Sequence, residues 1–366
     1  MRILALYLPQ YHEIEENNKW WGKNYMEWNA VKNAKPLFKE HRQPKKPLNN
    51  NYYDLSDEDA SAWKWQAELA RKYGIFGFCI YNYWFTGKQL LEKPMSILLK
   101  HKEINIKYCI CWANDSWTKT WYGLGNEVLI EQKYGKKDDW LKHYQYMLPY
   151  FKDERYIKIG NKPVLNIYRS SEILELVSMI KYWNELSQGD GFEGLYIVSG
   201  NTIYKNEDRD NLIDAYYNFE PGYTLKHKLN WLERLISMSV VRMKSKMNAL
   251  LNKQILERKF DARIINHAML RKDKIRSKPI YKGAFPQWDN TSRRGYKGMV
   301  YTNTTPKTFY ERLKKIDREL SRSNKDEDFV YINAWNEWGE GAYLEPDENN
   351  GYEYLEMIRK ITLGIK

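Results

Sequence analysis

The stretch FVYINAWNEWGEGAYLEPD, residues 329–347, joins an apolar run to two closely spaced carboxylates. Its first part, Phe329–Ile332, is β-branched and aromatic, as in a buried strand. Glu337 and Glu340 follow within eight residues, and glycines stand at positions 339 and 341. A buried strand that passes into acidic residues is typical of an α/β barrel, in which chemistry takes place at the C-terminal ends of the strands.

Similar runs recur along the chain and predict the fold. We expect strands at Ile3–Leu8, Ile75–Trp84, Lys107–Ala113, Pro163–Tyr168, Leu195–Ser199, Ala215–Phe219, Ile280–Phe285 and Phe329–Ala334. Helix-like segments lie between most of them, such as 305–323 and 54–74, where Ser56 or Asp57 can cap the helix and Gly74 can end it. This alternation predicts a (β/α)8 TIM barrel, and we expect residues 1–366 to form a single catalytic domain.

The positive charge is concentrated in one segment. The whole chain has a net charge of +12, and residues 223–278 supply +11 of it, with fifteen Lys and Arg against four carboxylates. Apolar residues such as Leu232, Ile236 and Met243 recur there at helical spacing, which predicts a basic helical insertion at 223–278, between strands 6 and 7. Its basic face is either solvated or meets anionic lipid or a lipid-phosphate-linked glycan. It lacks the interleaved stacking pattern of a nucleic-acid-binding module, so we expect no nucleic acid.

The cysteines and the N-terminus predict the compartment. Cys79, Cys109 and Cys111 lie in apolar runs, which is typical of buried thiols in a reducing compartment. The beginning of the chain, MRILALYLPQYH, resembles a first strand more than a signal peptide, and no run approaches the ~18 apolar residues of a membrane span. We therefore expect a cytoplasmic protein, peripheral to the inner membrane if the insertion binds lipid.

The spacing of the two carboxylates indicates acid–base chemistry. If the chain turns helically after the last strand, Glu337 and Glu340 can face one cleft. Neighbouring carboxylates resist ionising together, so one keeps its proton near neutral pH and the pair supplies an acid and a base. Cleavage of a glycosidic bond requires such a pair. The alternative, which the spacing leaves open, is that Glu337 pairs with an arginine and the glycines only make a turn.

Aromatic and polar residues near the strand ends are the candidate substrate contacts. Trp335 and Trp338 offer apolar faces to a pyranose ring, and Asn333 and Asn336 offer amides for its hydroxyls. For each candidate the alternative is a structural role. The complete set of expected substrate-binding residues is Gln10, His12, Trp28, Tyr83, Trp84, Asn114, Asp115, Trp117, Trp288, Asp289, Asn333, Trp335, Asn336 and Trp338. The chain has no metal-ligand spacing, and we expect neither a metal nor an organic cofactor.

Several longer motifs resemble a known family. They are LPQYHEIEENNKWWGKNYMEWNAVKNAKPLFKEHRQPKKP (8–47), CIYNYWF (79–85), KQLLEKP (88–94), CWANDSWTKTWYG (111–123), PQWDNTSRRG (286–295) and NAWNEWGEGAYLEP (333–346). In this order they resemble the WbsX-like proteins, the glycoside hydrolase family 99-like group associated with bacterial surface polysaccharide loci. The match covers nearly the whole chain except the basic insertion.

The resemblance implies a (β/α)8 barrel that acts on glycans. As in the family 99 endo-α-mannosidases, Glu337 would assist the sugar's 2-hydroxyl as internal nucleophile, and Glu340 would be the general acid/base of a retaining reaction. Glu345 is near enough in sequence to contribute, and it equally suits a structural turn. Departures from the family pattern put mannose specificity in doubt: the mannosidases often have a bulkier residue in place of Gly339, and Asn82, Asp115 and Lys119–Thr120 also differ.

The name WbsX was attached to a presumed glycosyltransferase, which is the runner-up class. Three Asp-x-Asp copies, Asp57–Asp59, Asp208–Asp210 and Asp326–Asp328, lie at expected helix starts or loops, and we interpret them as caps and solvated charge. No glycine-rich phosphate loop follows a strand. A hydrolase or transglycosidase of polysaccharide or lipopolysaccharide metabolism is therefore the leading prediction, with an oligo- or polysaccharide, in some cases lipid-linked, as its partner. A non-catalytic glycan-binding barrel would not need paired carboxylates.

Overall fold

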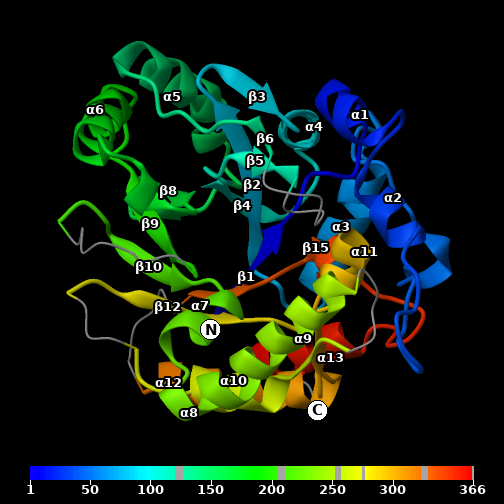
Figure 1. Cartoon of the computed structure of the whole chain (residues 1–366). Coiled ribbons are helices and arrows are strands. Elements are labelled where there is room, and N and C mark those ends of the chain that lie inside the picture. Colours follow the sequence, from blue (N-terminus) through cyan, green and yellow to red (C-terminus); the bar gives the residue numbers. More distant parts are fainter. Residues whose placement is uncertain (120–126, 204–210, 252–256, 274–276, 323–328, 365–366) are drawn as a thin grey trace.

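Eight parallel strands close into a barrel at the centre of the molecule (Figure 1). The computed structural model describes residues 1–119, 127–203, 211–251, 257–273, 277–322 and 329–364. The barrel strands are β1 (Arg2–Tyr7), β2 (Gly77–Phe85), β4 (Lys107–Trp112), β8 (Lys162–Ile167), β9 (Tyr196–Asn201), β10 (Ala215–Asn218), β12 (Ile280–Ala284) and β14 (Phe329–Ile332). Each pairs with the next, and β14 pairs with β1, so the predicted TIM barrel and its eight strands are confirmed.

The strands are buried on both faces. Every residue of β2 and β14 is buried, because one face of each strand fills the barrel and helices cover the other. Strand β1 closes the barrel by pairing with both neighbours. Leu4 of β1 lies opposite Gly77 of β2 on one side and opposite Tyr331 of β14 on the other. The C-terminal ends of all eight strands therefore meet at one end of the barrel.

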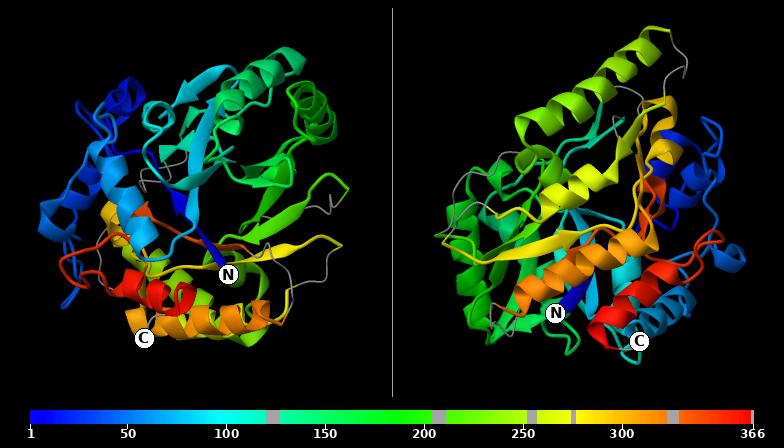
Figure 2. Two further views of the ribbon diagram at one scale, coloured as in Figure 1. Left: turned by 180° about the vertical axis from the view of Figure 1, so that it is seen from behind. Right: turned by 90° about the horizontal axis from the view of Figure 1, so that it is seen from below.

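Helices surround the barrel (Figures 1 and 2). They are α1 (Glu15–Trp21), α2 (Glu27–Lys32), α3 (Ser61–Lys72), α4 (Lys93–Lys100), α5 (Lys137–Phe151), α6 (Leu176–Gly189), α7 (Gly222–His227), α8 (Trp231–Arg234), α9 (Val240–Leu250), α10 (Ala262–Met269), α11 (Thr291–Arg294), α12 (Pro306–Leu320) and α13 (Glu353–Thr362). The minor strands are β3 (Lys88–Leu90), β5 (Trp117–Thr118), β6 (Val128–Ile130), β7 (Lys158–Ile159), β11 (Lys259–Asp261), β13 (Val300–Thr302), β15 (Asn336–Glu337) and β16 (Ala342–Tyr343). The β9–β10 connection contains no helix in its described residues, 202–203 and 211–214.

Local signals explain where the two expected helices begin. Helix α3 begins at Ser61, four residues later than Asp57, but Oδ2 of Asp57 still accepts a hydrogen bond from the Ser61 backbone N–H at 3.1 Å. Of the three Asp-x-Asp copies, Asp57–Asp59 thus makes a local turn, and the other two lie outside the described residues. Thr305 caps α12 by accepting from the Thr308 N–H at 3.2 Å.

The predicted insertion between the sixth and seventh barrel strands is mostly helical. It contains α7, α8, a π-helical turn (Leu235–Ser239), α9 and α10, but it also contains β11, which pairs in parallel with β13. Its small core joins Val241, Phe260 and Ile265 to Phe285 and Tyr301, which follow β12. In the right-hand view of Figure 2, α9 stands out from the barrel. The single-domain boundary 1–366 stays a prediction.

Two further observations concern the cysteines and the helices. Cys79, Cys109 and Cys111 are buried and free, as expected. Within the described ranges, no helix is both long enough and apolar enough to cross a bilayer.

Candidate active site

The chain folds into a tight turn directly after β14. Strands β15 and β16 pair antiparallel, with Glu337 opposite Ala342, and a 3₁₀ turn, Trp338–Glu340, joins them. Gly341 closes the turn with a φ of +59°, and a Cβ there would lie 2.8 Å from the backbone nitrogen of Asp289. Only glycine both adopts this positive φ readily and leaves the space next to Asp289 free, so the turn requires glycine at position 341.

Asn336 anchors the turn to the end of β1. Its Oδ1 accepts from the Leu8 backbone N–H at 2.8 Å, and its Nδ2 donates to the Leu8 carbonyl at 3.0 Å. The Tyr11 hydroxyl donates to the Asn336 carbonyl. Because Asn336 is fully buried and its amide is used internally, it positions the turn and leaves no group for a sugar hydroxyl.

Glu337 and Glu340 meet at one guanidinium. Nη2 of Arg293 lies 3.0 Å from Oε2 of Glu337, and Nη1 lies 3.3 Å from Oε1 of Glu340. Nε of the same arginine donates to Oε1 of Glu27 at 2.8 Å. The side chains of Glu337 and Glu340 are 10% and 28% exposed. Both sequence alternatives therefore hold in part: Glu337 pairs with an arginine, and the two carboxylates lie on the same side of the turn.

Burial and mutual repulsion act against ionisation of this pair. The pKa of Glu337 is raised to about 8, mainly by burial and also by the charges of Glu340 and Glu27, while Arg293 opposes the rise. Burial also raises the pKa of Glu340, again against Arg293. These raised pKa values favour retention of a proton by the pair near neutral pH, and its acid–base role stays a prediction.

Gly339 makes room for the ion pair beneath the turn. A Cβ at this position would lie 1.7 Å from Oε1 of Glu27 and 2.5 Å from Nε of Arg293. Glu27 is fully buried, so it needs the arginine as its counter-ion. The departure from the family pattern at Gly339 therefore has a structural reason in this chain.

Alternate residues of β2 point to opposite sides. The negative charge of Glu337 raises the pKa of Tyr81 and of Tyr83, in addition to the larger effect of burial, so both phenols lie within electrostatic range of this carboxylate. Trp84 instead lies against α5, where its Nε1 donates to Asp139 and its ring stacks on His143 with centroids 4.7 Å apart. The structure brings Tyr83 toward the glutamates and places Trp84 away from them.

The polar residues after β4 are occupied mainly by Arg169, which follows β8. Asn114 donates to the Arg169 carbonyl at 2.9 Å and accepts from its N–H at 2.8 Å, while Asp115 forms an ion pair with the Arg169 guanidinium at 2.5 Å. The buried ring of Trp117 packs edge-on against Tyr83 at 5.2 Å. Trp117 therefore shares the Tyr83 side of the barrel, and Asn114 fixes the loop.

The tryptophans expected to form a stacking floor are buried. Trp335 is fully buried against Phe78, and Trp338 is 1% exposed, stacked on Tyr343 with centroids 3.7 Å apart. Trp28 packs against Trp338 at 5.4 Å. The structure thus corrects this expectation: the three rings support the turn from below, because the aromatic faces are used in packing.

Glu345 belongs to the same supporting layer. It accepts from Trp338 Nε1 at 2.6 Å, from Gln66 Nε2 at 2.7 Å and from the Tyr53 hydroxyl at 3.0 Å. Burial raises its pKa to about 7 in spite of these donors. Of its two sequence interpretations, the structural turn is the one the contacts support.

Three other candidates have internal partners. Nδ1 of His12 lies 3.0 Å from the Pro9 carbonyl, and burial lowers the pKa of His12 to about 4. Nδ2 of Asn333 donates to the Glu220 carbonyl at 2.9 Å. The Gln10 carbonyl accepts from the Glu27 N–H at 3.1 Å, and its side chain is buried. Asn333 thus joins the loops after β14 and β10, whereas the contacts of His12 and of the Gln10 backbone fix the loop after β1.

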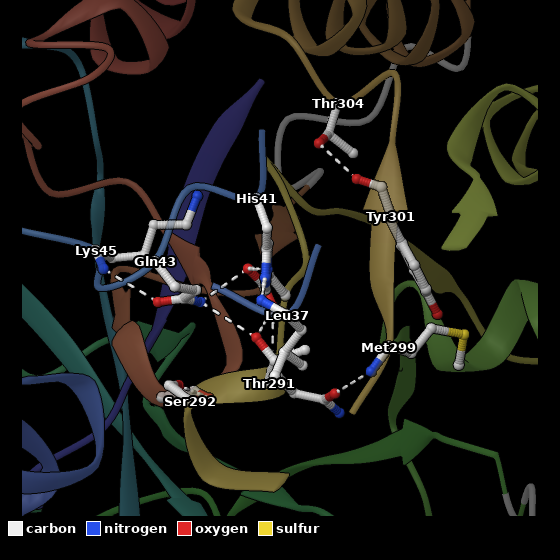
Figure 3. Close-up of polar contacts among 12 residues, drawn as sticks. Leu37, His41, Gln43, Lys45, Thr291, Ser292, Met299, Tyr301 and Thr304 are labelled. Atoms are coloured by element: carbon white, nitrogen blue, oxygen red, sulfur yellow. Dashed lines mark hydrogen bonds and ion pairs between the residues drawn. The ribbon is translucent and has the colours of Figure 1, made fainter. Parts of the chain in front are cut away.

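Trp288 and Asp289 line a cavity beside the turn. The Asp289 backbone N–H donates to the Glu340 carbonyl at 2.8 Å, so this wall is continuous with the candidate active site. Trp288 is half-buried and stacks on Tyr301 with centroids 5.9 Å apart. Figure 3 shows the polar contacts around this cavity.

Sequence reasoning missed Glu27, Arg293 and Tyr81. Glu27 and Arg293 lie 266 residues apart, and no local pattern joins them. A signal for Tyr81 existed, because residues two apart on a strand share a face, so Tyr81 belongs with Tyr83. In the part of the chain that the structure describes, no three His, Cys, Asp or Glu side chains are arranged to hold a metal ion.

Comparison with known proteins gives a family and a fold. The family model described as Glycosyltransferase WbsX matches residues 3–358. The uncharacterized protein WxcX of Xanthomonas campestris pv. campestris strain B100 is 33% identical over 359 residues, which cover 98% of this chain and 49% of that protein. WxcX of strain ATCC 33913 is also 33% identical over 363 residues, with the same coverage of both chains. The chain therefore spans about half the length of these relatives.

Solved structures share the barrel at low identity. A GH99 endo-alpha-mannosidase from Bacteroides thetaiotaomicron superposes with a TM-score of 0.57 and 14% identity, covering 99% of this chain and 96% of that one. A glycoside hydrolase-like protein superposes with a TM-score of 0.58 and 13% identity, covering 99% and 93%. These likenesses show the fold. From the match over residues 3–358, the chain belongs to the WbsX glycosyltransferase family.

Proposed function

We propose that this chain is a glycan-processing enzyme that cleaves or transfers a glycosidic bond with retention of configuration, in bacterial surface polysaccharide metabolism. The observation that carries the proposal is the meeting of Glu337 and Glu340 at the guanidinium of Arg293. Two carboxylates with raised pKa values share protons there, at the C-terminal end of a barrel strand. An α-mannoside is the first substrate to test, because the structural neighbours are described as endo-alpha-mannosidases.

The two glutamates have different proposed roles. Glu340 has the more exposed side chain and donates a proton to the leaving-group oxygen, then removes one from the incoming acceptor. Glu337 is more enclosed and accepts the proton of the sugar's 2-hydroxyl as that oxygen attacks the anomeric carbon. Glu337 must be ionised for this step; because its pKa is raised to about 8, the ionised form predominates only above that pH, and Arg293 favours it.

The test compares two leaving groups. Glu340→Gln should lower turnover about a hundredfold or more on a glycoside with a poor leaving group, and much less on an activated aryl glycoside, since the latter departs without protonation. Glu348→Gln, which changes an exposed carboxylate paired with Lys46, is the control. Equal losses on both substrates would contradict the acid/base role. NMR of the first-formed product would report retention or inversion.

Two alternatives remain open to the same assays. A glycosyltransferase, as the family name has it, would turn over only with an activated sugar donor. A non-catalytic glycan-binding barrel would bind polysaccharide equally well as wild type and as the Glu337→Gln, Glu340→Gln double variant, with no turnover by either. The substrate to screen is the polysaccharide made by the enzymes of the neighbouring genes, and NMR identifies the product.

We also propose that the insertion meets an anionic membrane surface and that the glycan is lipid-linked. Helix α9 and the turns before it expose Ile236, Met243 and Leu250 by 59%, 56% and 85%, whereas Val241 and Asn248, on the opposite face, are buried. An apolar stripe that faces outward and is flanked by Arg242 and Lys246, among other cations, fits an interfacial helix.

Liposome flotation tests this contact. The chain should float with vesicles that contain acidic lipid and float less with neutral vesicles, and Ile236→Asp with Met243→Asp should abolish flotation. Absence of flotation with both kinds of vesicle would end the proposal. The location that follows is the cytoplasmic face of the inner membrane.

A further inference from the structure

A separate cavity of about 310 Å³ lies beside the Glu337–Glu340 turn. Its walls come from the segment 38–45, from the residues after β12 and from the small sheet of β11 and β13. Such a volume is at the lower end of the range for small-molecule sites and suits a single sugar residue. The insertion at 223–278 contributes Lys259 to the lining, so the cavity is formed jointly by the barrel and the insertion.

Positive charge predominates around this cavity. Four cations, Lys39, Arg42, Lys45 and Lys259, line it, against the carboxylates of Glu40 and Asp289. Lys259 also forms an ion pair with Glu257 at 2.6 Å. The excess of cations favours a ligand that carries negative charge.

Asp289 is the buried carboxylate nearest to these cations in effect: against burial, a hydrogen bond from His41 and the charge of Lys45 lower the pKa of Asp289. Its Oδ2 accepts from Gln43 Nε2 at 2.8 Å, and its Oδ1 accepts from the Thr291 hydroxyl at 2.5 Å (Figure 3). Nδ1 of His41 accepts from the Leu37 N–H at 3.0 Å, so the ring carries its proton on Nε2 and donates to Asp289 at 3.0 Å. Neutral donors thus occupy both oxygens of this carboxylate.

Lys45 is the buried cation of the cavity. It is 9% exposed, and its charge acts on the carboxylate of Asp289, but among the described residues no carboxylate lies within ion-pair distance of its ammonium group. Its own backbone N–H donates to Oε1 of Gln43, which fixes the loop beside the cavity. A largely buried charge that lacks a counter-ion in direct contact is stabilised when a ligand supplies one. An anion that enters the cavity would supply it.

Aromatic rings line the same space. Trp288 is half-buried and stacks on Tyr301, and Phe38 stacks on His41 with centroids 4.3 Å apart. Nζ of Lys259 lies 4.0 Å from the centre of the Phe38 ring. Rings beside cations are suited to a ligand with both an apolar ring face and a charged substituent.

We infer that this cavity binds an acidic sugar residue of the glycan, with its carboxylate or phosphate at Lys45 and its ring beside Trp288. This inference rests on the proposed function, because it names the charge class of the same substrate. The link is the hydrogen bond from Asp289 N–H to the Glu340 carbonyl, which places the cavity next to the turn that carries the catalytic pair. The site would select a charged polysaccharide over a neutral one.

Binding without turnover tests this inference. Glucuronate, glucose 6-phosphate, glucose and inorganic phosphate are titrated into the whole chain at constant ionic strength by ligand-observed NMR. At least one acidic sugar should bind about tenfold or more tightly than glucose, since a charge-assisted contact is gained. A preference for glucuronate identifies a carboxylate, and a preference for glucose 6-phosphate identifies a phosphate.

Variants locate the site. Lys45→Met should weaken binding of the acidic sugar about tenfold, while Lys46→Met, the adjacent exposed lysine paired with Glu348, should leave it unchanged. Arg42→Gln removes an exposed cation of the cavity and gives a second reading if Lys45→Met unfolds.

Three results would overturn the inference: equal binding of glucose, unchanged binding by both cavity variants, or inorganic phosphate that binds as tightly as either acidic sugar. Loss of the proposed catalysis has a different signature. In that case Glu340→Gln would leave turnover unaltered, whereas binding of the acidic sugar would still depend on Lys45.

Discussion

Nη2 of Arg293 lies 3.0 Å from Oε2 of Glu337. This arginine lowers the pKa of both carboxylates against the effect of burial. Without Arg293, the pKa of each carboxyl group would be higher. Ionisation of the base and loss of the proton from the acid would then both occur at higher pH. The contact therefore sets the pH range in which the pair has one acid and one base.

Arg293→Met should move both limbs of the pH–activity curve to higher pH and lower activity at pH 7. It should also destabilise the fold by about 3–5 kcal/mol, because Glu27 keeps a buried charge without its partner. Chemical denaturation and a pH–rate profile measure the two effects. Adding Glu27→Gln to the variant should restore much of the stability, and unchanged pH limbs would contradict the role.

Gly339→Ala should destabilise the fold by about 1–3 kcal/mol and reduce activity, since the new Cβ would overlap the Glu27 carboxylate and push Arg293 aside. Gly189→Ala is the control: position 189 ends α6 in open space, and its effect should stay within about 1 kcal/mol. Thermal melting and the same glycoside assay compare them. Similar behaviour of the two variants would show that the turn accommodates a side chain.

Tyr83→Phe should lower turnover about tenfold, because the phenol lies within electrostatic range of Glu337 and its hydroxyl can stabilise charge that develops there. Trp84→Phe, one residue along, should keep turnover near wild type and cost about 1 kcal/mol of stability through the lost bond to Asp139. Steady-state kinetics with urea denaturation separates the two. A larger kinetic effect at Trp84 would reverse the assignment of the two faces.

Glu345 should make stability depend on pH. Its pKa is raised to about 7 in the folded state, so the folded protein binds the proton more tightly than the unfolded chain. The resulting stabilisation is complete below pH 4.5 and is lost as the pH rises through 7, by about 3 kcal/mol in total. Urea denaturation at pH 5 and pH 8 should show a smaller difference for Glu345→Gln than for wild type. An equal difference would rule out Glu345 as a source of the pH dependence.

The barrel was predictable because each strand is a contiguous apolar run. In β14 the apolar run and the glycines of the turn lie within a few residues of one another. In α12 and α3 the helix start is marked by a nearby capping residue, Thr305 or Asp57. The β11–β13 pairing was not predictable, because it joins the insertion to a strand on the far side of β12.

The candidate site was predictable only where spacing decides it. Glu337 and Glu340 follow from one turn, whereas the Glu27–Arg293 pair depends on tertiary contacts between distant segments. Composition also cannot tell a tryptophan that stacks on a ligand from one that packs inside. Trp335 and Trp338 show this, since both are almost completely buried.

The lack of a side chain at residue 339 constrains how this chain can diverge. A descendant that acquires any larger residue there cannot keep the carboxylate of Glu27 and the guanidinium of Arg293 in their present places. We therefore expect residues 27, 293 and 339 to change together among homologues. Exchanging one of them alone between two homologues should give a protein that is less stable than either parent.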